Sequence, residues 1–321
     1  MCTPVTCATS RMVAANSASF VRADPVAVGT SIVVDSYCKR LSFAHGHGED
    51  RDMRLSVVTD EISRDLETAL ELACEWGVDG VELRHIGEGR WPAVPEPTAA
   101  RVPELIRDHA LPVAAISPGL FKIETPRPGD AEALARQHLT ELLPRSIAPA
   151  QDLGADVIVC FSFLRGAAER PGPAPELVID VLRDAARQVR DAGLTLAVEV
   201  EYGCWGDVAE RTAEIVARVG DTALGINWDP ANAYRSGEDR PFPDGYRAVR
   251  ELVRHVHYKQ ASVLADGRRG WALDGVIDWP GQLAALAADD YQGWVSAEPH
   301  LRPKVRSTKT TIERMRRHIP A

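Results

Sequence analysis

Four acidic or imidazole side chains stand at the ends of four successive strand-like runs in the second half of the chain. They are Glu199, Asp229, His257 and Glu298, and helical patterns separate the runs that carry them. Strands that alternate with helices indicate a parallel sheet. In a closed α/β barrel the C-terminal ends of the strands converge on one face, which holds the active site. We therefore expect these four side chains to lie close together.

Such a cluster favours a bound metal. Three carboxylates buried together repel one another, and burial without a counter-charge costs several kcal/mol for each. A divalent cation resolves that conflict, whereas solvated or ion-paired side chains are the alternative interpretation. One imidazole and three carboxylates suit Mn²⁺, which we favour, as well as Mg²⁺, Co²⁺, Fe²⁺ or Zn²⁺. The sequence thus predicts one divalent metal ion, with all four residues as its ligands.

Neighbouring residues on the same strands could contact a substrate. Side chains two residues apart share a strand face. On this basis we expect Lys259 to be catalytic, holding a substrate oxygen or acting as an electrophile. The residues predicted to bind substrate on the strands are Glu82, Arg84, Glu201 and His255. An internal ion pair is the alternative for Glu82 and Arg84, and a hydrogen-bonded core histidine is the alternative for His255.

The loop predicted over 260–277 is polar and contains Arg268. We expect this side chain to hold a phosphate or carboxylate group of the substrate. The alternative is that it belongs to a solvated basic loop.

The elements that position these residues form a regular series. The predicted strands are 54–59, 78–84, 112–117, 156–163, 194–201, 224–229, 253–259 and 294–298. A helix follows each, including 130–153, which Pro144 should kink or divide, and 304–318. Ser63 is expected to cap the first helix and Gly77 to end it. Eight strand–helix pairs predict a single (β/α)₈ TIM barrel over residues 53–321.

Residues 1–52 have a different character. They are rich in Ala, Ser, Thr and Val, lack helical periodicity and show no convincing signal peptide. We interpret them as a disordered or mis-assigned N-terminal extension that contributes nothing to the barrel.

Bulk properties narrow the class of partner. The formal net charge of −9 argues against a nucleic-acid partner. No apolar run approaches the roughly 18 residues of a membrane span. The six cysteines form no CxxC motif, so we expect reduced thiols and a cytoplasmic location. A small carbohydrate-like molecule is the expected ligand, and the oligomeric state, a homo-oligomer included, stays open.

Several segments together resemble a known family. They are residues 58–62, 81–84, 228–233, 255–259 and 296–300. Over about residues 54–318 the chain resembles the xylose isomerase-like TIM-barrel superfamily. That group includes sugar phosphate isomerases and epimerases, ketose 3-epimerases, inosose dehydratases, hydroxypyruvate isomerases and apurinic endonucleases.

The resemblance assigns the family's metal ligands to Glu199, Asp229, His257 and Glu298. Asn232 takes the place of a His found in ketose 3-epimerases, which argues against that activity, and we expect Asn232 to bind substrate. The chain also lacks the metal-type His residues of apurinic endonucleases at the ends of its second and third strands.

The function implied is a metal-dependent isomerase or epimerase. It would act on a sugar, cyclitol or related hydroxy-ketone, with Glu199 and Glu298 transferring protons through a metal-stabilised enediolate. A lyase or dehydratase using the same site for β-elimination is the first alternative. A non-catalytic, sugar-binding accessory subunit is the second, and the intact ligand set argues against it.

Overall fold

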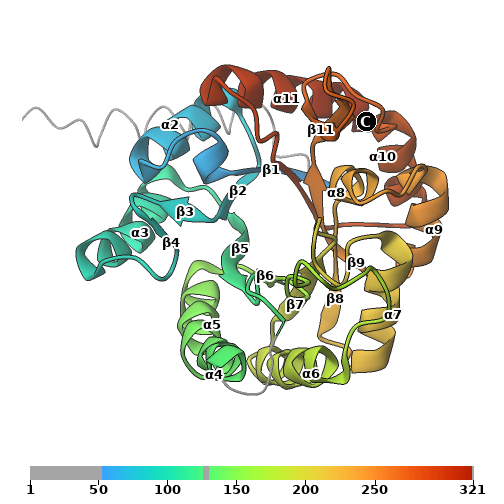
Figure 1. The fold of residues 1–321 in the computed structure, drawn as a ribbon. Coiled ribbons are helices and arrows are strands. Elements are labelled where there is room, and N and C mark those ends of the chain that lie inside the picture. Colours follow the sequence, from blue (N-terminus) through green and yellow to red (C-terminus); the bar gives the residue numbers. More distant parts are fainter. Residues whose placement is uncertain (1–52, 126–129, 320–321) are drawn as a thin grey trace, which may run out of the picture.

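The computed structural model describes residues 53–125 and 130–319, so the extension expected at 1–52 lies outside the described residues. Eight parallel strands close into a barrel in the order β1-β12-β9-β8-β7-β6-β5-β2, with helices around its outside (Figure 1). The strands are β1 Arg54–Val58, β2 Gly80–Leu83, β5 Val113–Leu120, β6 Val157–Cys160, β7 Thr195–Glu199, β8 Leu224–Trp228, β9 Val253–Tyr258 and β12 Trp294–Ala297. The predicted (β/α)₈ barrel is confirmed.

The helices pack their apolar stripes against the strands. They are α2 Leu66–Trp76, α3 Glu96–His109, α4 Asp130–Gln137, α5 Leu143–Leu153, α6 Glu176–Asp191, α7 Ala209–Val219, α8 Pro230–Arg235, α9 Tyr246–Val249, α10 Trp279–Ala288 and α11 Lys304–His318. In α6, Val178, Leu182, Ala185 and Val189 recur at helical spacing and are buried. Because these positions share one side of the helix, the opposite side stays polar and faces solvent.

The predicted helix over 130–153 is divided, as expected. A π-helical turn, His138–Leu142, separates α4 from α5, and Pro144 stands in the first turn of α5. Proline has no backbone N–H and its ring crowds the carbonyl four residues earlier, so regular α-helical bonding is interrupted there.

Two local predictions were wrong. Asp65, not Ser63, caps α2, because its side chain accepts the Thr68 amide at 2.9 Å, while the Ser63 hydroxyl accepts the Asp65 amide. The polar stretch 260–277 is not only loop. It contains an antiparallel hairpin of β10 Gln260–Val263 and β11 Arg269–Ala272.

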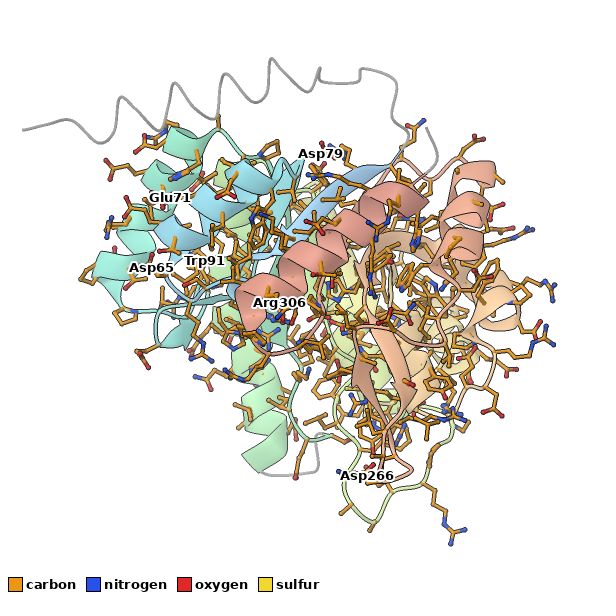
Figure 2. All side chains as sticks on the ribbon, turned by 90° about the horizontal axis from the view of Figure 1, so that it is seen from above. Asp65, Glu71, Asp79, Trp91, Asp266 and Arg306 are labelled. Carbon is orange, nitrogen blue, oxygen red and sulfur yellow. The ribbon has the colours of Figure 1, made fainter. Side chains whose placement is uncertain are left out.

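The hairpin shows which end of the barrel carries the strand C-termini. Figure 2 places Asp266, in the turn between β10 and β11, at one end of the molecule, and Asp79, just before β2, toward the other. The side chains that follow the C-terminal strand ends therefore gather on the side from which the hairpin extends.

Cysteine state and hydropathy complete the description. Within residues 53–125 and 130–319, Cys160 and Cys204 are free and buried. Among the described residues no helix is both long enough and apolar enough to cross a membrane.

Candidate active site

The four predicted ligands come from neighbouring strands. Glu199 ends β7, His257 lies in β9, and Asp229 and Glu298 directly follow β8 and β12. One ligand atom from each lies within 4.8 Å of those of the other three, and all four residues are buried. His257 Nδ1 is 3.2 Å from Glu298 Oε2 and 3.4 Å from Glu199 Oε1. The structure thus brings together the residues that the strand ends predicted.

Asp229 is held by the helix that follows it. Its Oδ1 accepts the backbone N–H of Asn232 at 2.8 Å, which caps the N-terminus of α8. The Asn232 side chain donates through Nδ2 to Asp229 Oδ2 at 2.9 Å and to Glu199 Oε1 at 3.1 Å. Asn232 therefore holds Glu199 and Asp229 in fixed positions relative to each other, and the substrate contact expected of it stays a prediction.

Glu82 orients the ring of His257. The Glu82 carboxylate lies 3.1 Å from His257 Nε2 and 2.8 Å from His255 Nε2, and Ser296 Oγ is 3.1 Å from the same His255 nitrogen. A proton on His257 Nε2 that is donated to Glu82 leaves Nδ1 as the lone-pair atom facing Glu199 and Glu298. The arrangement is a carboxylate–histidine pair of the kind that supports metal ligands.

Burial and hydrogen bonding describe the places of Glu82 and His255, which were predicted to bind substrate. Glu82 and His255 are fully buried. The Glu82 carboxylate contacts His255 and His257, and His255 Nε2 also contacts Ser296. Burial would raise the pKa of Glu82, but in the metal-free protein the charge of protonated His257 and the hydrogen bond from His255 outweigh it and hold the pKa well below its usual range. These residues support the cluster from within the barrel, and the substrate contact predicted for them stays a prediction.

The donor set fits a divalent cation. Burial raises the pKa of Asp229 to about 6; the nearby charge of Lys259 opposes that rise, while Glu199 and Glu298 add to it. Three buried carboxylates supply hard, anionic oxygen atoms and His257 supplies one imidazole nitrogen, all within 4.8 Å of one another, a set that matches Mg²⁺, Mn²⁺ and similar ions. Sulfur is missing from the cluster, which disfavours a structural zinc site.

Lys259 borders the same cluster. Its buried ammonium lies 2.6 Å from Asp229 Oδ2 and donates to Glu298 Oε2. Its backbone carbonyl accepts the Trp279 indole N–H at 2.8 Å, which fixes the strand end behind it. Lys259 is therefore placed beside two of the proposed ligands, as strand alternation predicted.

Arg84 belongs to an ion-pair network beside Glu298. Its guanidinium contacts both oxygens of Asp60, at 2.8 and 3.0 Å, then Glu61 at 2.6 Å, and it also donates to Glu298. The internal ion pair offered as the alternative interpretation is what the structure contains, although with Asp60 and Glu61 rather than Glu82. Arg84 therefore positions Glu298, and the substrate-binding role predicted for it stays a prediction.

Two further residues predicted to bind substrate differ in their distance from the cluster. Glu201 lies 3.2 Å from Lys122 and 3.4 Å from Asn232 Nδ2, next to the cluster. Arg268 lies in the hairpin turn with its side chain 82% exposed and paired with Asp266. Arg268 is therefore not part of the cluster, and the solvated basic loop describes it better.

Sequence reasoning missed two residues that touch this region. His300 Nδ1 lies 2.8 Å from Glu61 Oε1, and His300 Nε2 lies 3.3 Å from Glu298 Oε1. His300 stands two residues after Glu298, so strand alternation could have indicated it. Glu61 follows β1, and only its place beyond a strand end could have drawn attention to it.

The fold and the site together define the class of protein. It is a (β/α)₈ barrel that carries buried carboxylates and a histidine at the C-terminal ends of its strands. Residues 70–318 match the model of the xylose isomerase-like TIM barrel family, and the chain belongs to this family. No curated protein sequence matches the chain.

Solved structures with the same fold share little sequence with the chain. D-psicose 3-epimerase from Clostridium cellulolyticum H10, solved with D-tagatose, is 16% identical with a TM-score of 0.65, covering 84% of this chain and 100% of that one. A xylose isomerase-like TIM barrel protein from Mycobacterium smegmatis, in complex with magnesium, is 17% identical with a TM-score of 0.61, covering 78% and 86%. A probable 3-DHS dehydratase from Bacillus anthracis is 18% identical with a TM-score of 0.62, covering 81% and 98%. At these identities the likeness concerns the fold.

Proposed function

We propose that the chain is a metal-dependent isomerase or epimerase of a sugar, cyclitol or related hydroxy-ketone. The observation that carries this proposal is the convergence of Glu199, Asp229, His257 and Glu298 within 4.8 Å, with Lys259 beside them. A divalent ion held by those four residues would supply Lewis-acid chemistry for negative charge on the substrate. Epimerases among the structures of similar fold are consistent with this class of chemistry.

Two carboxylates of the chain can move the proton. Glu199 ends β7 and Glu298 follows β12, and β8 and β9 separate these strands in the barrel. A substrate carbon held between them presents one face to each carboxylate, so that one removes a proton and the other returns it. Transfer at opposite faces inverts the carbon, which is what an epimerase requires.

Lys259 and Asn232 complete the proposed apparatus. The Lys259 ammonium, next to Asp229 and Glu298, can donate a hydrogen bond to a substrate oxygen as charge develops there. Asn232 keeps Glu199 and Asp229 in fixed orientations through its two contacts. Both groups are buried, so water is largely excluded from the reacting centre.

Elimination is the second candidate. The same base could remove a proton next to a carbonyl while the acid protonates a departing β-hydroxyl or β-alkoxy group. A probable dehydratase among the structures of similar fold is consistent with this outcome. Product analysis separates the candidates, because elimination yields an unsaturated product and isomerisation does not.

The test is a substrate screen in D₂O with the Mn²⁺-loaded protein. Ketoses, inososes and keto-glycosides are incubated with it, and NMR follows deuterium uptake and product formation. We expect uptake at one carbon of an accepted substrate, lost on chelation, and product formation lost in Glu298→Gln. Uptake should be retained in Glu238→Gln, a control carboxylate that accepts the Ala209 amide at 2.9 Å. Turnover that persists in Glu298→Gln at the wild-type rate would contradict the proposed role of Glu298.

A further inference from the structure

Arg235, near the proposed site, has guanidinium N–H groups that no acceptor within the described residues satisfies. Arg235 ends α8, and its Nε is buried with no hydrogen-bond partner among the described residues. Its guanidinium carbon lies 3.9 Å from the centre of the Trp271 ring and 4.9 Å from that of Tyr202. No ion pair joins Arg235 to a carboxylate within the described part of the chain.

A nearby arginine shows what a structural role looks like here. Arg269, on β11, also stacks on an aromatic ring, that of Tyr234 at 4.2 Å. Unlike Arg235, it donates to the Tyr234 carbonyl at 2.7 Å and pairs with Asp239. Stacking alone therefore does not account for Arg235, because aromatic contact leaves the in-plane N–H groups of a guanidinium unsatisfied.

Arg235 lies on the same side of the barrel as the metal-ligand cluster. Helix α8 begins directly after Asp229 and contacts the β10–β11 hairpin (Figure 1). The Trp271 ring that faces Arg235 also lies 4.9 Å from the Lys259 ammonium and 5.5 Å from the His300 ring. Trp271 thus lies close to both the unpartnered guanidinium and the lysine that contacts Asp229 and Glu298.

We propose that Arg235 binds an anionic group, a carboxylate or a phosphate monoester, on the part of the substrate remote from the reacting carbon. A planar guanidinium with free edge donors suits two oxygens of one anion, and flanking rings hold it in a fixed plane. The inference rests on the proposed function, since it names the class of substrate for the same site. It predicts an acidic polyhydroxy ketone rather than a neutral sugar.

The test compares three probes on the full-length, Mn²⁺-loaded protein at one ionic strength. D-Ribulose is neutral, D-ribulose 5-phosphate carries a phosphate monoester, and D-fructuronate carries a carboxylate at the end of the chain remote from its ketone. Calorimetry should show at least about tenfold tighter binding of one anionic probe than of D-ribulose, the scale of a charge-assisted hydrogen bond. Which anion binds more tightly distinguishes the two sources of charge.

Variants then test whether Arg235 is the source of the preference for an anionic probe. Arg235→Met should remove that preference, Arg235→Lys should keep part of it, and the control Arg269→Met should keep all of it. Equal binding of all three probes by the wild type, or a preference that survives in Arg235→Met, would overturn the inference. The second result would place the anion on the metal instead. If Arg235→Met does not fold, a full preference in Arg235→Lys argues against bidentate recognition.

The proposed function can fail separately. It fails if no substrate exchanges a proton with solvent, whatever the probes show, whereas the anion preference is measured by binding without turnover.

Discussion

Replacing Glu82 by Gln should weaken the binding of Mn²⁺ by about 10- to 100-fold, although Glu82 is not one of the four proposed ligands. The Glu82 carboxylate is fully buried and accepts from two imidazoles, His257 at 3.1 Å and His255 at 2.8 Å. A Gln amide has nearly the same shape but no charge and one acceptor oxygen. One of the two rings therefore loses its partner, and the Nδ1 atom of His257 becomes a weaker and less well-oriented donor.

The expected loss corresponds to roughly 1.4–2.7 kcal/mol of binding free energy, since each factor of ten is about 1.4 kcal/mol. Titration with Mn²⁺, followed by electron paramagnetic resonance of the free ion, measures the affinity directly. Glu238→Gln is the matched control, because it makes the same chemical change in a carboxylate that bonds the Ala209 amide. A thermal melt of the metal-free protein checks that both variants fold. An unchanged Mn²⁺ affinity in folded Glu82→Gln would refute the idea that Glu82 orients a metal-binding His257.

Three other predictions concern catalysis, packing and pH. Glu199→Gln and Glu298→Gln should each lose at least about 10²-fold in turnover. One of them should keep solvent exchange into the substrate, since exchange needs only one face, and wild-type rates in both with metal bound would contradict the two-carboxylate mechanism. Trp279→Ala removes a fully buried ring stacked on Tyr258 at 4.1 Å, and should lower Tm by roughly 10 °C in calorimetry; a shift of under about 3 °C would show that the ring is not needed. Asp65→Ala should lose about 1 kcal/mol of stability at neutral pH through the missing helix cap. The backbone hydrogen bond lowers the pKa of Asp65 in the folded state, so this contribution is present above the unfolded pKa of about 3.9. This contribution should be lost as pH falls below that value. A difference in unfolding free energy between wild type and Asp65→Ala that stays constant in urea melts down to pH 2 would refute the predicted pH dependence.

The barrel was predictable because its elements repeat a simple pattern. Gly77 ends α2 with a φ of 64°, as a residue without Cβ allows, and α11 spans the predicted 304–318. The strand ends of β7, β8, β9 and β12 then followed from the topology, since parallel strands in a barrel direct their C-termini to one face. The positions of the strand ends were therefore enough to predict that Glu199, Asp229, His257 and Glu298 lie together.

The remaining features depend on tertiary contacts that spacing does not encode. Helix α8 has six residues, too few to show a helical period, so Arg235 could not be placed. Arg268 and Arg269 are adjacent, yet only the hairpin geometry decides that the first is exposed and the second bonds Tyr234. Glu82 faces inward as alternation requires, but its contacts with two histidines from β9 connect residues far apart in the sequence.

The stoichiometry of Mn²⁺ binding tests the central claim most directly. Wild-type protein should bind about one ion per chain, and Asp229→Ala should bind none under the same conditions. His300→Ala is the control, because His300 belongs to a different potential cluster with Glu61 and Glu298, and it should still bind one ion. Binding that survives in Asp229→Ala but is lost in His300→Ala would place the metal in that second cluster. No binding by the metal-free wild type, or three ions per chain, would contradict the proposed site altogether.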